Sequence, residues 1–301
     1  MRSGSRQRLQ ASLTEGPIGR GILAFAIPLF LGQLLQQLYN MADAWVVGNF
    51  ADNDAFAAVS MATHISFLII GFFNGIAIGG GVVISRYFGA KNETETERAI
   101  HTNFLFGIAA SLISTVVGVL LVPHILVWMH TPDSVMPDAL TYFRIYFAGV
   151  STIIMYNICM AIMRALGDSL RPLYYLMFSS VLNVILDLIF VAGYQWGVGG
   201  AAVATVISQG MSAVLCIFRM CRVKDYTGLN FQKLCYHRGM MGQVIRQGIP
   251  TGVQNSVISI GNLVVQANIN SFGAYAISGH GAYSKIEGLV FLPIMSMSLR
   301  H

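Results

Sequence analysis

The 301-residue chain is 55% hydrophobic and only 10% charged, with a net charge of +5 at pH 7 and a mean hydropathy of +0.63. A soluble domain carries about 25% charged residues, so this composition excludes an ordinary soluble protein. The basic balance does not indicate a nucleic-acid partner, because the Lys and Arg residues gather in the connections between apolar segments.

Eight apolar stretches are each long enough to cross a bilayer as a helix, which takes about 20 residues. They do not alternate as the strands of a membrane barrel would. The sequence therefore predicts an all-α, polytopic membrane protein that contacts the lipid bilayer. The predicted spans run near 24–49, 57–88, 101–123, 138–163, 172–193, 198–220, 247–271 and 276–299.

Positive charge is concentrated in alternate connections. Lys and Arg precede the first span and lie between spans two and three, four and five, and six and seven. The other connections hold the acidic residues Asp52, Asp54, Asp133 and Asp138. By the positive-inside rule, we expect a multi-pass protein of the cell inner (plasma) membrane with its N-terminus in the cytoplasm.

The first span carries a polar face. Gln33, Gln36, Asn40 and Asp43 are spaced by three or four residues and so share one side of a helix. Lipid contact would leave these groups unsatisfied, so this side is expected to line a cavity enclosed by protein. We assign Gln36 and Asn40 to a substrate cavity. Hydrogen bonding between helices is the alternative interpretation of the two glutamines.

Pro28 lies earlier in the same span. Proline removes a backbone hydrogen bond and kinks a helix. A bent helix that carries a titratable group is a plausible bistable element, and a static kink is the alternative.

Two carboxylates stand at bilayer depth, Asp43 in the first span and Asp187 in the fifth. A charge there costs roughly 2.5–3.5 kcal/mol and is usually functional. Asn183 lies one turn before Asp187, and Thr205 lies in a small-residue run of the sixth span. Their oxygen atoms suit a hard cation, and neighbouring buried carboxyl groups could also hold a proton. The set predicts a site for Na+, H+ or each in turn, with no other cofactor.

Lys285 and Glu287, early in the eighth span, are a weaker case. A position near the outer interface would let these side chains reach water at little cost. Asn157 in the fourth span lies deep in an apolar run and is expected to face the protein interior. No nucleophile and base stand together within the spans, so we do not expect an enzyme.

The segment after the sixth span repeats features of the beginning. Gly248-Ile249-Pro250 matches Ala26-Ile27-Pro28, and at the same offset Asn262 falls on Asn40. Six spans before the repeat would give both copies the same orientation, which is the parallel-repeat architecture of some transporters.

Three regions follow from this repeat. Residues 1–220 are predicted to form an N-terminal six-helix bundle, the N-lobe, and residues 221–246 a basic cytoplasmic linker. Residues 247–301 would be the first two helices of a second bundle, the C-lobe. A complete second bundle would hold six spans, so we expect the chain to be truncated at its C-terminus.

These residues resemble the multidrug and toxic compound extrusion (MATE) family, and in particular its DinF-like prokaryotic branch. The resemblance covers almost the whole chain. It rests on several motifs: Leu13-Thr14-Glu15-Gly16-Pro17-Ile18, Ala26-Ile27-Pro28, Gln36…Asn40…Asp43…Val47-Gly48, Arg164-Ala165-Leu166-Gly167-Asp168-Ser169, and Asn183…Asp187 followed by Gly197-Val198-Gly199-Gly200-Ala201-Ala202.

The resemblance implies a fold and an activity. Family members have about twelve helices in two six-helix bundles that enclose a V-shaped cavity, and they expel drugs and organic cations in exchange for Na+ or H+. By position, Asp43, Asn183, Asp187 and Thr205 resemble the N-lobe cation site of the DinF-like branch. Tyr142 and Asn157 resemble further residues of the N-lobe cavity.

Three functions remain open on this basis. The leading hypothesis is a secondary active transporter that exports drugs or organic cations by antiport with H+ or Na+. A lipid-linked oligosaccharide flippase of the same superfamily is the first alternative, although such a protein often needs more basic cavity residues. A non-transporting truncated fragment is the other. The sequence does not indicate an oligomeric state.

Overall fold

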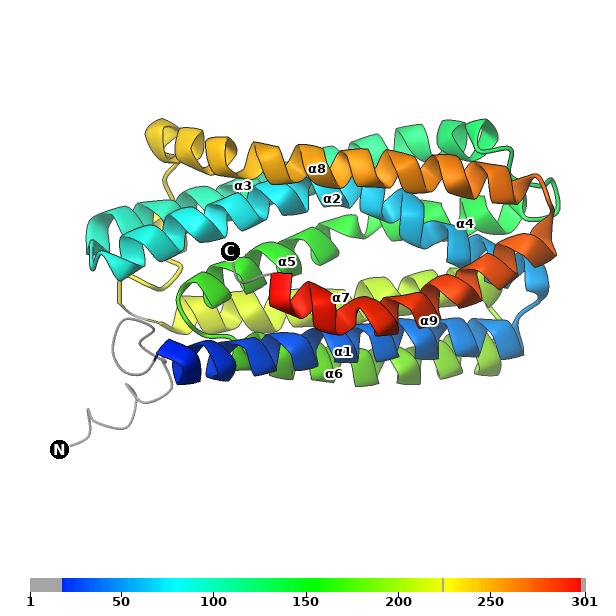
Figure 1. Cartoon of the computed structure of the whole chain (residues 1–301), viewed down its shortest axis with the longest axis horizontal. Helices are drawn as coiled ribbons and strands as arrows, with labels where there is room; N and C mark the ends of the chain where they lie inside the picture. The colour runs from blue at the N-terminus through cyan, green and yellow to red at the C-terminus, as the bar shows by residue number, and fades with distance from the viewer. Residues whose placement is uncertain (1–17, 224, 299–301) are drawn as a thin grey trace.

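A computed structural model describes residues 18–223 and 225–298, which form an all-α, polytopic bundle of long helices lying roughly along one axis (Figure 1). In chain order the elements of this part are α1 (Ile18–Phe50), α2 (Asn53–Gly89), α3 (Glu93–Trp128), α4 (Met136–Ala148), α5 (Val150–Ala165), α6 (Leu170–Asp187), the π-helix η2 (Leu188–Gly193), α7 (Gly197–Arg222), the 3-10 helix η3 (Phe231–Lys233), α8 (Arg238–Asn270) and α9 (Ala274–Ser298).

Each of the eight predicted spans corresponds to a helix or to a pair of helices. Among the described residues, four helices are long and apolar enough to cross a membrane: α2, α3, α6 continued by η2, and α7. The pair α4 and α5, bent by 50°, makes a fifth if it counts as one span. The helices α1, α8 and α9 lie beside them but fall outside that set. The helix α8 is less apolar than the others because amide and hydroxyl side chains recur between Gln254 and Asn270.

The break between α4 and α5 falls at Gly149, where a single predicted span becomes two helices. A Cβ atom at Gly149 would lie 2.3 Å from Cγ1 of Val206 on α7. Only glycine lets the bend approach α7 this closely, and the bend is therefore part of how α4 and α5 pack around α7.

The connections rich in Lys and Arg lie at one end of the bundle, which we call the basic end. The α2–α3, α5–α6 and α7–α8 connections meet there, whereas the α1–α2, α3–α4 and α8–α9 connections lie at the opposite end (Figure 1). The α7–α8 connection spans residues 223–237, because α8 begins at Arg238, within the predicted linker. The arrangement is that expected of helices that cross a membrane in alternating directions.

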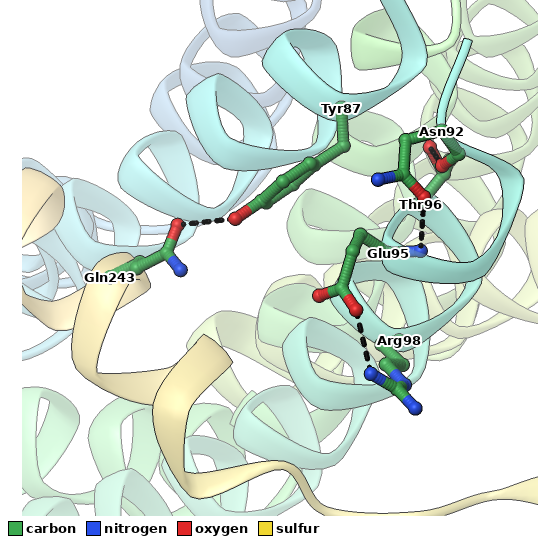
Figure 2. Close-up of polar contacts among 6 residues, drawn as sticks. All are labelled: Tyr87, Asn92, Glu95, Thr96, Arg98 and Gln243. Atoms are coloured by element: carbon green, nitrogen blue, oxygen red, sulfur yellow. Dashed lines mark hydrogen bonds and ion pairs between the residues drawn. The ribbon is translucent and has the colours of Figure 1, made fainter. Parts of the chain in front are cut away.

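Figure 2 shows polar contacts at the basic end: one joins α2 to α8, and the others lie at the start of α3. Tyr87 of α2 donates its hydroxyl to Oε1 of Gln243 on α8 at 3.0 Å. Asn92 caps the start of α3, because its Oδ1 accepts from the backbone N–H of Glu95 at 3.2 Å. The N-cap oxygen satisfies a backbone donor that the first turn of a helix leaves free.

The helices α2 and α8 lie side by side along much of their length (Figure 1). A Cβ at Gly75 would lie 2.4 Å from Cα of Gly252, and one at Gly79 would lie 2.4 Å from the backbone nitrogen of Gly248. Small residues permit such backbone contact between membrane helices. We call these four residues the glycine contact, and it joins the predicted N-lobe to the segment after the linker.

Large apolar side chains on the outside of the bundle are strongly exposed. On α3, Leu112, Val116 and Leu120 recur every four residues and are 62%, 58% and 62% exposed. Residues at this spacing share one helix face. In water such a stripe would be costly, and it is the surface that a helix presents to lipid.

Candidate functional site

The predicted polar face of α1 lines a cavity of about 1030 Å³ inside the bundle. Gln36, Asn40 and Asp43 all face this cavity, as their helical spacing predicts, and Tyr39 lies with them. The side chains of Pro28 and Gln33 lie outside the described residues, so the predicted kink and the predicted role of Gln33 stay predictions.

Asp43 meets Asp187 at the wall of this cavity. The Asp43 side chain lines the cavity and is only 7% exposed, and Asp187 on α6 lies behind it, fully buried. Their carboxyl groups lie close enough to interact electrostatically. The two acids that sequence reasoning placed on separate spans therefore form a pair, which requires α1 to pack against α6 as it does here.

Asn183 and Thr205 complete this group. The Asn183 amide is assigned the orientation in which it makes two hydrogen bonds. Its nitrogen donates to Asp187 Oδ2 at 2.7 Å, and its oxygen accepts from the backbone N–H of Thr205 at 3.2 Å. The Thr205 hydroxyl lies 3.4 Å from the hydroxyl of Tyr39. We call Asp43, Asn183, Asp187 and Thr205 the carboxyl site.

The carboxyl site has unused acceptor capacity. Among the described residues, Oδ1 of Asp43 and Oδ1 of Asp187 are buried and have no hydrogen-bond partner. Two buried carboxylates in contact repel each other unless a positive charge lies between them. A proton or a small hard cation would supply that charge, and carboxylate, amide and hydroxyl oxygens are the ligands that such cations prefer.

Helices α4 and α5 provide another wall of the cavity. Tyr142 lines it and stacks on Tyr146, with the ring centroids 5.8 Å apart. Asn157 also lines it, and its Nδ2 donates to the backbone oxygen of Ile153 on its own helix at 2.9 Å. The structure therefore brings the predicted cavity residues Gln36, Asn40, Tyr142 and Asn157 around one space.

Sequence reasoning missed several polar residues of the cavity. Tyr39 shares the helix face of Gln36 and Asp43, a signal that the spacing already contained. Gln209 lies one turn after Thr205 on α7. Lys285 and Glu287, the weaker case in the sequence, both line the cavity. The other polar lining residues not predicted are Ser66, Asn74, Tyr146, Tyr156, Asn262, His280 and Ser284.

The chain matches known proteins over most of its length. The family model MatE matches residues 28–189. The chain is 27% identical over 283 residues to the probable multidrug resistance protein YpnP of Bacillus subtilis, covering 94% of this chain and 63% of that protein. It is 24% identical to the multidrug export protein MepA of Staphylococcus aureus, again covering 94% and 63%. It thus spans less than two thirds of the length of these relatives.

Solved structures share the fold. A MOP superfamily transporter from Pyrococcus furiosus superposes with a TM-score of 0.84 at 23% identity, covering 96% of this chain and 64% of that one. The outward-facing form of a MATE family multidrug resistance transporter gives a TM-score of 0.83 at 23% identity, with the same coverage. Its inward-facing counterpart gives 0.79 at 22% identity, covering 96% and 62%.

Proposed function

This chain belongs to the MATE family of multidrug efflux transporters, and we propose that it exports drugs or organic cations across the inner (plasma) membrane by antiport with H+ or Na+. The carboxyl site is the proposed binding site of the coupling ion, and the cavity beside it is the proposed cargo site. The N-terminus would lie in the cytoplasm, together with the basic end of the bundle.

The observation that carries this proposal is the paired burial of Asp43 and Asp187. Burying two contacting carboxyl groups is unfavourable for a purely structural purpose. The same pair becomes stable when it holds one positive charge. A site of this kind is expected to bind and release a cation during each transport cycle.

Antiport requires that the coupling ion and the cargo favour different conformations. A ligand shifts a two-state equilibrium only by its differential affinity for the two states. Asp43 lines the cavity, whereas Asp187 lies behind it. A cationic cargo near Asp43 would therefore draw on the same negative charge that holds the coupling ion. Competition for this charge supplies the differential affinity, and bending of α1 would be a second source.

Ethidium accumulation in a bacterium that lacks its own efflux pumps tests the proposal. Cells that express the protein should retain less ethidium than control cells. Asp187→Asn keeps the acceptor for Asn183 but removes the charge, and it should abolish the difference. Asp133→Asn, at an exposed acid in the α3–α4 connection, should leave it intact. Unchanged efflux in a well-expressed Asp187→Asn variant would rule out the proposed coupling site.

The flippase alternative is less well supported. Phosphate-bearing lipid precursors call for Arg or Lys in the cavity. Among its described lining residues, Lys285 is the only Lys or Arg. An uptake assay that compares cationic dyes with lipid-linked precursors separates the two functions.

A further inference from the structure

Lys285 on α9 lines the same cavity as Asp43. Its backbone oxygen accepts from Nε2 of Gln37 on α1 at 2.7 Å. One turn later, a Cβ at Gly288 would lie 2.4 Å from the same Nε2 atom. These contacts hold α9 directly against α1, so the base of the Lys285 side chain has a fixed position beside the face that carries Asp43.

Among the described residues, the Lys285 ammonium forms no ion pair within 4.0 Å. Within the described part of the chain, the ion pairs within 4.0 Å are Arg98 with Glu95 and Arg171 with Asp168, both at the basic end. Glu287 lines the same cavity, but its Oε1 accepts from the hydroxyl of Tyr283 at 3.3 Å. Lys285 and Asp43 line the same cavity, and their opposite charges attract each other across it.

The lysine side chain suits a movable charge. It is a compact ammonium on a flexible four-carbon stem, and it can approach or leave a carboxylate without any change in the backbone. Lys285 and Asp43 line one cavity of about 1030 Å³. The space between them is therefore the space that a cargo would occupy.

We propose that Lys285 is a tethered cation of the cavity, which balances the charge of Asp43 when neither cargo nor coupling ion is bound and competes with both for that charge. The inference rests on the carboxyl site of the proposed function. The proposal adds Lys285 as a residue that sets how strongly the cavity favours cationic ligands. It also links α9 to α1 through an attraction between Lys285 and Asp43 that depends on whether cargo or coupling ion is bound.

Competition between Lys285 and a bound cation predicts the direction in which a substitution changes cation affinity. A cation that enters the cavity must compete with the Lys285 ammonium for the charge of Asp43, so the lysine weakens cation binding. Lys285→Met keeps a flexible, unbranched side chain that is one atom shorter, and it removes the charge. Coupling between two such groups typically corresponds to about a fivefold or larger change in affinity.

Two measurements on the whole chain in lipid nanodiscs test this inference. The first is ethidium affinity by fluorescence polarisation. Lys285→Met should bind ethidium at least about fivefold more tightly than the wild type. The same substitution should not increase ethidium affinity when Asp43→Asn is already present. Lys91→Met removes a lysine from the exposed α2–α3 connection and should leave the affinity unchanged.

The second measurement needs no ligand. Lys285→Met should lower the melting temperature by about 2–4 °C, because it leaves the repulsion between Asp43 and Asp187 without a nearby positive charge. The loss should shrink when Asp43→Asn is already present, because that substitution removes the charge that Lys285 balances. An equal loss in both backgrounds, or equal ethidium affinity in the wild type and Lys285→Met, would overturn the tethered cation. If Asp43→Asn alone leaves ethidium affinity unchanged, the proposed cargo site fails, while the melting experiment still decides the role of Lys285.

Discussion

The carboxyl site and the glycine contact are two ways of joining helices without apolar side chains, and they have opposite mechanical properties. At the glycine contact, backbone atoms of α2 and α8 approach so closely that a single added Cβ would lie 2.4 Å from its neighbour. At the carboxyl site, buried oxygen atoms of Asp43 and Asp187 remain without a partner in the described part of the protein. The first contact leaves no room for change, whereas the second leaves capacity for a ligand.

This difference indicates where the molecule can change shape. A close backbone contact has one favourable arrangement, because either a shift or an added atom produces overlap. A pair of carboxyl groups has at least two arrangements, with and without a positive charge between them. We therefore expect α2 and α8 to move as one unit, and the relation of α1 to α6 and α9 to depend on the bound ion.

The largest expected effect is at the glycine contact. Gly75→Leu would force a side chain into the backbone of Gly252 and should destabilise the protein by about 3 kcal/mol or more, as overpacking does at its upper end. The measurement is thermal unfolding of the purified protein in detergent. Gly261→Ala on α8 is the matched control, since nothing lies within 4 Å of the added Cβ. A Gly75→Leu variant that melts like the wild type would show that α2 and α8 do not meet here.

At the carboxyl site, a substitution is expected to raise the stability of the protein rather than lower it. Asp187→Asn removes the repulsion with Asp43 and keeps an acceptor for Asn183, so it should raise the melting temperature in sodium-free neutral buffer by about 2–4 °C. Any rise that NaCl produces in the wild type relative to choline chloride should disappear, because stabilisation by a ligand requires its site. A lower melting temperature would mean that the carboxylate is a structural anchor.

Tyr39→Phe should have a smaller effect, because it removes one hydroxyl that lies 3.4 Å from the Thr205 hydroxyl. A hydrogen bond of this kind contributes about 0.5–1.5 kcal/mol. The same melting assay measures the loss. If Tyr39 helps to hold Thr205 for the ion, the NaCl-dependent rise should also shrink. A change in stability without any change in ion response would limit Tyr39 to packing.

The smallest effect is expected outside both regions. Arg98→Ala breaks the exposed ion pair with Glu95 at the start of α3 (Figure 2). Exposed pairs contribute about 0–1 kcal/mol, so the melting temperature should fall by no more than about 2–4 °C. A larger loss would show that the basic end contributes to the stability of the bundle more than its exposure suggests.

Helical periodicity in one span predicted the most reliable parts of the site. The spacing of Gln36, Asn40 and Asp43 indicated a shared face, and that face lines the cavity. Periodicity does not report which helices are neighbours. Spacing within one helix could therefore not show that Asp43 and Asp187 meet. The sequence singled out Lys285 without assigning it to the cavity, and it did not identify Gln209, because both residues lie on other helices.

The fold shows the same limit. Apolar length located all eight helical regions, but it did not predict the bend at Gly149, which depends on the distant residue Val206. The close packing of α2 at Gly75 and Gly79 likewise depends on distant residues, Gly252 and Gly248 of α8. Local patterns predict elements, and contacts between distant residues decide how these elements bend and pair.

The π-helical turn η2 directly after Asp187 has a consequence for the tolerance of this region to changes in length. A π turn contains one residue more than an α-helical turn, so it can absorb a single-residue insertion within a continuous helix. Deleting one residue between Leu188 and Gly193 should therefore restore regular α-helical winding while the side chains on either side of the turn keep their directions. A regular α-helix at this place would not tolerate the same deletion, because there it would turn every later side chain by about 100° relative to Asp187.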